Sequence, residues 1–116
     1  MKRIILFSSL ILICLVLNAR VLKVGIYENK PLVYIDDTKK PKGLFVDVLK
    51  NIAEKENWEI EYIYQSWADC LRLLGKDSID ILVDIAYTEK RSELFDFNKE
   101  NVFVNWGIVY VNDQSI

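Results

Sequence analysis

The 116-residue sequence contains no histidine. This absence excludes Ser-His and Cys-His nucleophile pairs, imidazole metal ligands and a histidine pH switch, and with them most hydrolytic chemistry. The sequence also lacks a basic excess, because 15 Lys and Arg residues stand against 17 Asp and Glu residues. Neutralising nucleic-acid phosphates needs such an excess, so no nucleic-acid partner is expected. The length is that of one small domain, which excludes a large multidomain enzyme.

The N-terminal segment, residues 1–19, has the composition of a secretory signal. Two basic residues precede an apolar run from Ile4 to Leu17, and Asn18-Ala19 follow it. This run fits the central region of a signal peptide and is shorter than the roughly 20 residues that span a bilayer. We therefore expect export to a periplasmic or extracytoplasmic location, with cleavage after Ala19. An uncleaved membrane anchor is the alternative, and the large Leu17 favours it.

Cysteine is scarce, and the two cysteines lie in different contexts. Cys14 is in the apolar N-terminal run, where the bulky Ile13 before it argues against lipid modification. Cleavage would leave Cys70 as the sole cysteine, so no intramolecular disulfide is expected. Cys70 lies on the apolar stripe of a predicted helix, which indicates an inert buried thiol.

The remaining residues, 20–116, alternate strand and helix patterns without repeats or linkers. Nearly continuous or alternating apolar runs indicate strands, and apolar residues at helical spacing indicate helices. The order predicts an α/β domain with a mostly parallel sheet, flanking helices and right-handed crossovers. In chain order we expect a strand at 21–27, a hairpin or loop at 32–43, a helix at about 44–56, a strand at 58–64, a helix at 67–74, a strand at 79–85, a short helix at 89–94 and an extended run at 101–111.

Polar and small residues predict the helix ends. Ser66 precedes the second helix as an N-cap, with Asp69 three residues later as the acidic partner of a capping box. Gly75 ends that helix as a C′ glycine. Thr88 is the expected N-cap of the short helix.

Ligands of an open parallel sheet bind beyond the carboxyl ends of its strands. The loops at that edge therefore supply the candidate site. The candidate ligand-binding residues are Glu28, Trp67, Asp84, Ala86, Thr88 and Arg91.

Each candidate has a functional and a structural interpretation. A helix N-terminus at Thr88 and the guanidinium of Arg91 can hold an anionic group, or they are a cap and a surface arginine. Asp84 can hold a ligand ammonium group or serve as a turn carboxylate. Trp67 is a stacking platform or a core residue, and Glu28 is a pocket residue or a solvated one.

The pattern provides no catalytic machinery. No nucleophile has a base beside it, and Asp47, Asp80 and Asp84 lack the clustered spacing of metal ligands. We expect a protein that is not an enzyme, with no catalytic residue, no metal and no cofactor.

Several segments together resemble one family. The G-x-F-x-D-[VL]-L and T-E-K-R elements lie within them, and the resemblance extends from Val21 to about Val111. These segments resemble the first lobe of the family 3 extracellular solute-binding proteins. The resemblance is strongest to the sensor-domain variant found ahead of histidine kinases and diguanylate cyclases. The segments are VGIYENKPLVYID, KGLFVDVLKNIAEKENWEIEYI, DILVDIAYTEKRSELFDFNKE and NWGIVYV.

The resemblance implies a two-lobed, hinged fold of the type II periplasmic-binding-protein kind that closes on an amino acid or related small carboxylate. By position, it implies that Arg91 grips the ligand carboxylate and that Ala86 to Thr88 supply backbone groups. Glu28 and Trp67 match pocket-lining positions. The sequence departs from transport members before T-x-x-R, where Asp84, Ile85 and Ala86 replace serines or threonines.

The resemblance implies that residues 20–116 are the N-terminal lobe alone, with the second lobe absent. We therefore expect non-catalytic, extracytoplasmic binding of a small polar solute by a truncated solute-binding protein, with a membrane permease or receptor as partner. The alternatives are the ligand-sensing input domain of a membrane receptor and an enzyme built on the same scaffold. An uncovered surface is expected to cause self-association; it comprises Phe103, Trp106, Ile108 and Tyr110.

Overall fold

The structure is a computed structural model and describes residues 19–105. It divides after Ala86 into two compact units. Of the signal segment expected at 1–19, only Ala19 lies within the described residues. Trp106, Ile108 and Tyr110, which belong to the surface expected to self-associate, lie outside them. Among residues 19–105, no helix has the length and apolar character needed to cross a bilayer.

The first unit is built on a three-stranded parallel sheet. It comprises β1 (Arg20–Ile26), β4 (Trp58–Tyr64) and β5 (Ile81–Leu82), in the order β4-β1-β5. β1 pairs with β4 along its whole length, from Arg20 opposite Trp58 to Ile26 opposite Tyr64. The predicted parallel sheet is confirmed.

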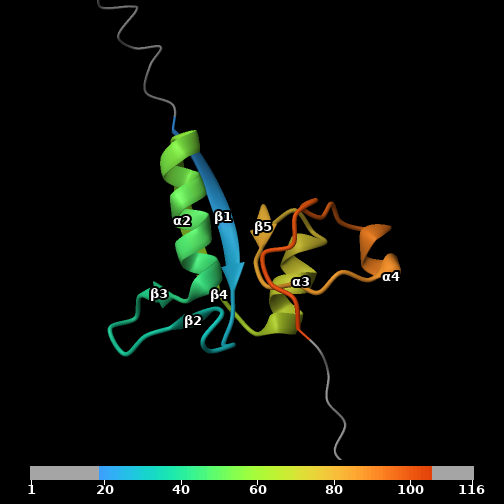
Figure 1. The fold of residues 1–116 in the computed structure, drawn as a ribbon, viewed down its shortest axis with the longest axis horizontal. Coiled ribbons are helices and arrows are strands. Elements are labelled where there is room, and N and C mark those ends of the chain that lie inside the picture. The colour runs from blue at the N-terminus through green and yellow to red at the C-terminus, as the bar shows by residue number, and fades with distance from the viewer. Residues whose placement is uncertain (1–18, 106–116) are drawn as a thin grey trace, which may run out of the picture. The chain divides into compact units, whose positions relative to one another are not determined.

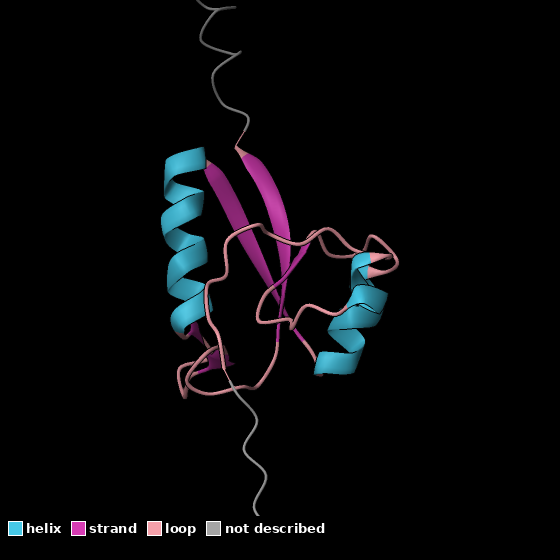
Figure 2. Cartoon of the chain, turned by 45° about the vertical axis from the view of Figure 1, so that its right-hand side comes forward, coloured by secondary structure: helices cyan, strands magenta, loops and turns pink. Residues whose placement is uncertain are grey.

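Two helices flank this sheet. α2 (Leu44–Glu56) connects β1 to β4, and α3 (Trp67–Leu74) connects β4 to β5. Because β4 and β5 lie on opposite sides of β1, right-handed crossovers place the two helices on opposite faces of the sheet. Figures 1 and 2 show α2 and α3 on either side of the long strands. The predicted α/β class with flanking helices is therefore confirmed.

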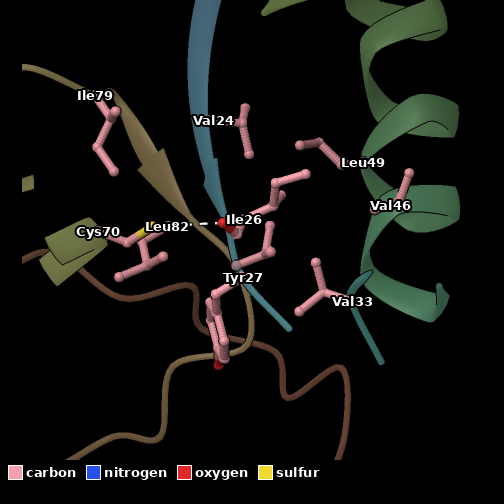
Figure 3. Packing of buried hydrophobic residues seen from close by; sticks show 10 residues of the cluster. Val24, Ile26, Tyr27, Val33, Val46, Leu49, Cys70, Ile79 and Leu82 are labelled. Atoms are coloured by element: carbon pink, nitrogen blue, oxygen red, sulfur yellow. Dashed lines mark hydrogen bonds between the residues drawn. The ribbon is translucent and has the colours of Figure 1, made fainter. Parts of the chain in front are cut away.

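The core lies on both faces of β1 (Figure 3). Side chains alternate along a strand, and one face of β1 presents Val24 and Ile26, both fully buried, beside Val46 and Leu49 of α2. Gly25 faces the other way, where a Cβ atom would lie 2.6 Å from Ile79 Cδ1 and 3.4 Å from Cys70 Cβ. The missing side chain thus allows α3 and the segment that leads into β5 to pack closely on the central strand.

A small antiparallel hairpin precedes α2, as predicted. β2 (Tyr34–Ile35) pairs with β3 (Pro41–Lys42). The carboxylate of Asp36 closes the turn, because its Oδ1 accepts hydrogen bonds from the Thr38 amide, the Thr38 hydroxyl and the Lys40 amide.

The strand expected at 79–85 is much shorter in the structure, since β5 contains only Ile81–Leu82. At its start, the Asp80 carboxylate accepts the Lys23 amide at 2.8 Å, so a side chain replaces part of the backbone pairing. At its end, Asp84 adopts a left-handed conformation with φ of 56°. That conformation is incompatible with an extended strand and ends the pairing.

Three further boundaries differ from the expectations. Gly75 is right-handed, with φ of −66°, so it is not a left-handed C′ glycine; the turn after α3 continues to Asp77, which has φ of 54°. In the second unit, α4 (Glu89–Ser92) is two residues shorter than expected. Residues 101–105 form no strand, and the rest of the run expected at 101–111 lies outside the described residues.

The cap of α3 confirms the predicted capping box. The Ser66 hydroxyl accepts the Asp69 amide at 3.1 Å and donates to the Asp69 carboxylate at 2.7 Å. Arg72 also donates to this carboxylate, at 2.9 Å. The hydrogen bonds from Arg72 and Ser66 lower the pKa of the Asp69 carboxyl.

A Ser66→Ala variant is expected to lose about 1 kcal/mol of unfolding free energy at pH 7, because the N-cap hydrogen bond disappears. A carboxyl group with a lowered folded-state pKa stabilises the fold above its unfolded pKa and loses that contribution as the pH falls. The difference from wild type should therefore narrow below about pH 4. Urea unfolding at several pH values measures this difference in unfolding free energy. Ser78→Ala, at an exposed position, is the control. An equal loss in both variants would contradict the prediction.

Candidate functional site

The carboxyl edge of the parallel sheet is where the polar loops of the first unit converge. β4 and β5 flank β1 on opposite sides, so the chain reverses its direction of winding at β1. Such a reversal opens a crevice at the carboxyl ends of the two adjacent strands. The loops there begin at Tyr27 after β1 and at Val83 after β5.

Asp84 joins these two loops through hydrogen bonds. Its Oδ2 accepts the Asn29 side-chain amide at 2.6 Å and the Tyr27 hydroxyl at 3.2 Å. The Tyr27 hydroxyl also donates to the backbone oxygen of Asp84, at 2.5 Å. We call Tyr27, Asn29 and Asp84 the switch-point cluster.

Tyr27 connects the hydrophobic core to this edge. The residue is 8% exposed, and in Figure 3 its ring points away from the other core side chains. Burial, followed by the nearby Asp84 charge, raises the pKa of the Tyr27 phenol. The group therefore stays protonated in the physiological range and acts as a hydrogen-bond donor.

Asn29 has a firmly held backbone. Its amide donates to the Val33 oxygen at 2.7 Å, and its own oxygen accepts from the Val33 amide at 3.0 Å. Val33 is fully buried. Although Asn29 is exposed, this bridge fixes the position from which its side chain reaches Asp84.

Of the predicted site residues, only Asp84 belongs to the switch-point cluster. Glu28 is exposed and forms an ion pair with Lys30 at 3.5 Å, which agrees with the solvated interpretation. Trp67 is half-buried at the start of α3 and packs against the core cluster. Ala86 is exposed at the end of the first unit.

Thr88 and Arg91 belong to the second unit, whereas the switch-point cluster belongs to the first. The Thr88 hydroxyl accepts the Arg91 amide at 3.2 Å, so Thr88 is the N-cap of α4 as predicted. Arg91 is half-buried. Within this unit, the rings of Tyr87 and Phe97 meet edge to face, with their centroids 5.3 Å apart.

Sequence analysis did not select Tyr27 and Asn29 as site residues. Their position directly after β1 was the available signal, but nothing local indicates that Asp84, 55 residues after Asn29, approaches them. Cys70 is fully buried and its thiol donates to the Ile26 oxygen at 3.5 Å, while burial raises the pKa of the thiol. Within residues 19–105, no three potential metal-ligating side chains cluster.

The parallel sheet, the opposed helices and the reversal at β1 are the fold of the periplasmic binding proteins. Residues 22–116 match the bacterial extracellular solute-binding proteins, family 3. The chain belongs to this family. No curated protein sequence matches the chain.

Three solved structures illustrate the similarity. A histidine kinase sensor domain with similarity to periplasmic binding proteins is 28% identical, with a TM-score of 0.59 over 66% of this chain and 33% of that chain. An ancestral cyclohexadienyl dehydratase is 26% identical, with a TM-score of 0.56 over 63% of this chain and 31% of that chain. The arginine-bound form of domain 1 from TmArgBP, a mutant, is 25% identical, with a TM-score of 0.58 over 63% of this chain and 58% of that chain. The matched part thus spans about a third of the first two proteins and more than half of the single domain.

Proposed function

We propose that this protein binds a small polar solute, an amino acid or a related carboxylate, without catalysing a reaction. The observation that carries the proposal is the switch-point cluster, a set of hydrogen-bonding groups at the carboxyl ends of two adjacent parallel strands. Periplasmic-binding-protein folds bind ligands where such loops converge. Family membership supports the same conclusion.

The ligand carboxylate is assigned to Arg91, with Thr88 and Ala86 supplying hydrogen-bonding groups beside it. A guanidinium holds a carboxylate with two parallel hydrogen bonds, which gives both strength and orientation. The arginine-bound TmArgBP domain supports an amino acid as the ligand. Glu28 and Trp67 are proposed as lining residues, and Asp84 as the partner of a cationic group.

Binding without chemistry is favoured by the state of the cysteine. Cys70 is fully buried, and its raised thiol pKa keeps the nucleophilic thiolate scarce. The dehydratase neighbour makes catalysis the competing hypothesis. Turnover of a cyclohexadienyl substrate by this protein would overturn the non-catalytic proposal.

We assign residues 20–116 to the first lobe of a solute-binding domain, exported by the segment at 1–19. The match to an isolated first domain supports this assignment. A membrane permease or receptor is the proposed partner, and self-association involving the exposed Phe103 stays a prediction. The sensor-domain neighbour favours a second candidate role, the input domain of a membrane receptor. Cleavage after Ala19, measured by N-terminal sequencing of exported protein, supports the soluble role, and retention of the segment supports the receptor role.

L-Arginine or glutarate, at ten times its dissociation constant, is expected to stabilise the wild-type protein by about 1.4 kcal/mol, which raises the melting temperature by several degrees. In an Arg91→Ala variant the shift should disappear. Thermal unfolding with and without each compound measures it. Arg72→Ala, which removes a helical arginine that pairs with Asp69, is the matched control and should keep the shift. A full shift in Arg91→Ala would contradict the assigned role.

A further inference from the structure

We infer that Tyr27 and Asn29 are positioning residues that orient the Asp84 carboxylate toward a cationic group of the ligand. The inference rests on the proposed function, since it concerns how the same site recognises its solute. Neither residue is among the candidates that the sequence suggested.

The two oxygens of Asp84 have different surroundings. Oδ2 accepts both side-chain donors, Asn29 at 2.6 Å and Tyr27 at 3.2 Å. In the part of the chain that the structure describes, Oδ1 accepts no hydrogen bond, although Asp84 is half-buried. Oδ1 is not among the buried side-chain atoms without a partner in the described residues, so it is open to a donor from outside the protein. A cationic donor forms the stronger, charge-assisted hydrogen bond with a carboxylate.

The backbone of Asp84 is also restrained by this cluster. The residue is left-handed, with φ of 56°, a conformation that aspartate tolerates better than most residues. The Tyr27 hydroxyl holds the Asp84 backbone oxygen at 2.5 Å. Because the Tyr27 ring is buried and the Asn29 backbone is bridged to Val33, both donors approach Asp84 from fixed positions.

This geometry defines the chemical class of the group that Asp84 recognises. Donors to Oδ2 leave a single oxygen for the ligand, which suits the compact point charge of an ammonium group better than the two-pronged guanidinium. A dicarboxylate has no such group. The cluster is therefore expected to favour L-arginine, which carries an ammonium group, over glutarate, which carries none.

The first experiment requires no ligand. Amide hydrogen exchange, measured by NMR, is expected to become about tenfold faster in β5 in Tyr27→Phe, because Ile81 and Leu82 pair with β1 and the bond that holds the following loop at the Asp84 oxygen is lost. Exchange at Val24 in the central strand serves as the reference for global opening. Tyr62→Phe is the matched control, because the buried Tyr62 hydroxyl has no hydrogen-bond partner in the described part of the chain. Unchanged exchange at Ile81 and Leu82 in Tyr27→Phe would overturn the inference.

The second experiment separates positioning from general stability. In Asn29→Ala the dissociation constant for L-arginine should rise about tenfold while that for glutarate stays unchanged. Asn51→Ala, at an exposed position of α2, should alter neither. Equal weakening of both probes in Asn29→Ala would overturn the positioning role. If the wild type binds neither probe, the proposed function fails, and hydrogen exchange still decides whether Tyr27 holds the Asp84 backbone.

Discussion

A Gly43→Ala variant is expected to lose about 4 kcal/mol of unfolding free energy, since backbone strain and steric overlap each cost about 1–3 kcal/mol. Gly43 precedes α2 with φ of 117° and ψ of 170°, a region that only glycine adopts readily. A Cβ atom there would lie 2.7 Å from the Leu32 carbonyl carbon and 2.9 Å from the Pro31 oxygen. It would also overlap the Leu32 oxygen.

These neighbours cannot move away without further loss. They are backbone atoms, and the Leu32 oxygen accepts the Phe45 amide at 3.0 Å at the start of α2. A shift of this segment would therefore break the connection between the hairpin and the helix. Domains of this size have about 5–15 kcal/mol of stability, so the loss would leave the fold marginal.

Urea unfolding followed by circular dichroism measures the effect. Gly75→Ala is the matched control, because Gly75 is exposed and right-handed with φ of −66°. Alanine accepts that conformation and restricts the unfolded chain, so the control should be neutral or stabilised by less than about 1 kcal/mol. Equal stability of the two variants would refute the role assigned to Gly43.

An Ile26→Ala variant is expected to lose about 2–5 kcal/mol, the range for removing a large aliphatic side chain from a core. Ile26 is fully buried at the end of the central strand. Its side chain lies on the face of β1 beside α2, where Val46 and Leu49 are also buried. Because protein interiors are closely packed, the cavity collapses only in part.

The same substitution at an exposed site is the control. Ile52 on α2 is 41% exposed. Ile52→Ala removes the same atoms, but these atoms bury less apolar surface, so less stabilising free energy is lost. Alanine also has the better helix propensity, which offsets part of the loss. Denaturant midpoints for the two variants measure the difference, and a loss at Ile52 as large as that at Ile26 would contradict the core assignment.

Local chemistry predicted most of the elements of the first unit. The helix at 44–56 and the strand at 58–64 have the expected bounds, because their apolar patterns extend over several turns or alternations. Ser66 and Thr88 cap their helices as predicted, since a cap depends on residues within one turn. The order of these elements was also sufficient to predict the parallel α/β class.

Sequence patterns were less accurate where a helix has more than one apolar face that could be buried. In α2, the apolar residues at 45, 48, 49, 52 and 53 recur at helical spacing and by themselves indicate one buried face, yet Val46 is fully buried and Ile52 is exposed. Several adjacent positions of α2 are apolar, so the sequence permits more than one buried stripe. Packing against the sheet selects the stripe that includes Val46, Leu49 and Ala53.

For the candidate site, sequence identified Asp84 but not the residues that hold it. Its position after an apolar run placed it at the carboxyl edge of the sheet, and that prediction needs only strand direction. The short β5, the left-handed Asp84 and the bonds from Tyr27 and Asn29 arise from contacts between segments more than 50 residues apart. Periodicity and capping are properties of neighbouring residues, so the sequence contains them directly. The pairing of β5 with β1 brings distant loops together, and only the folded chain establishes which polar groups meet there.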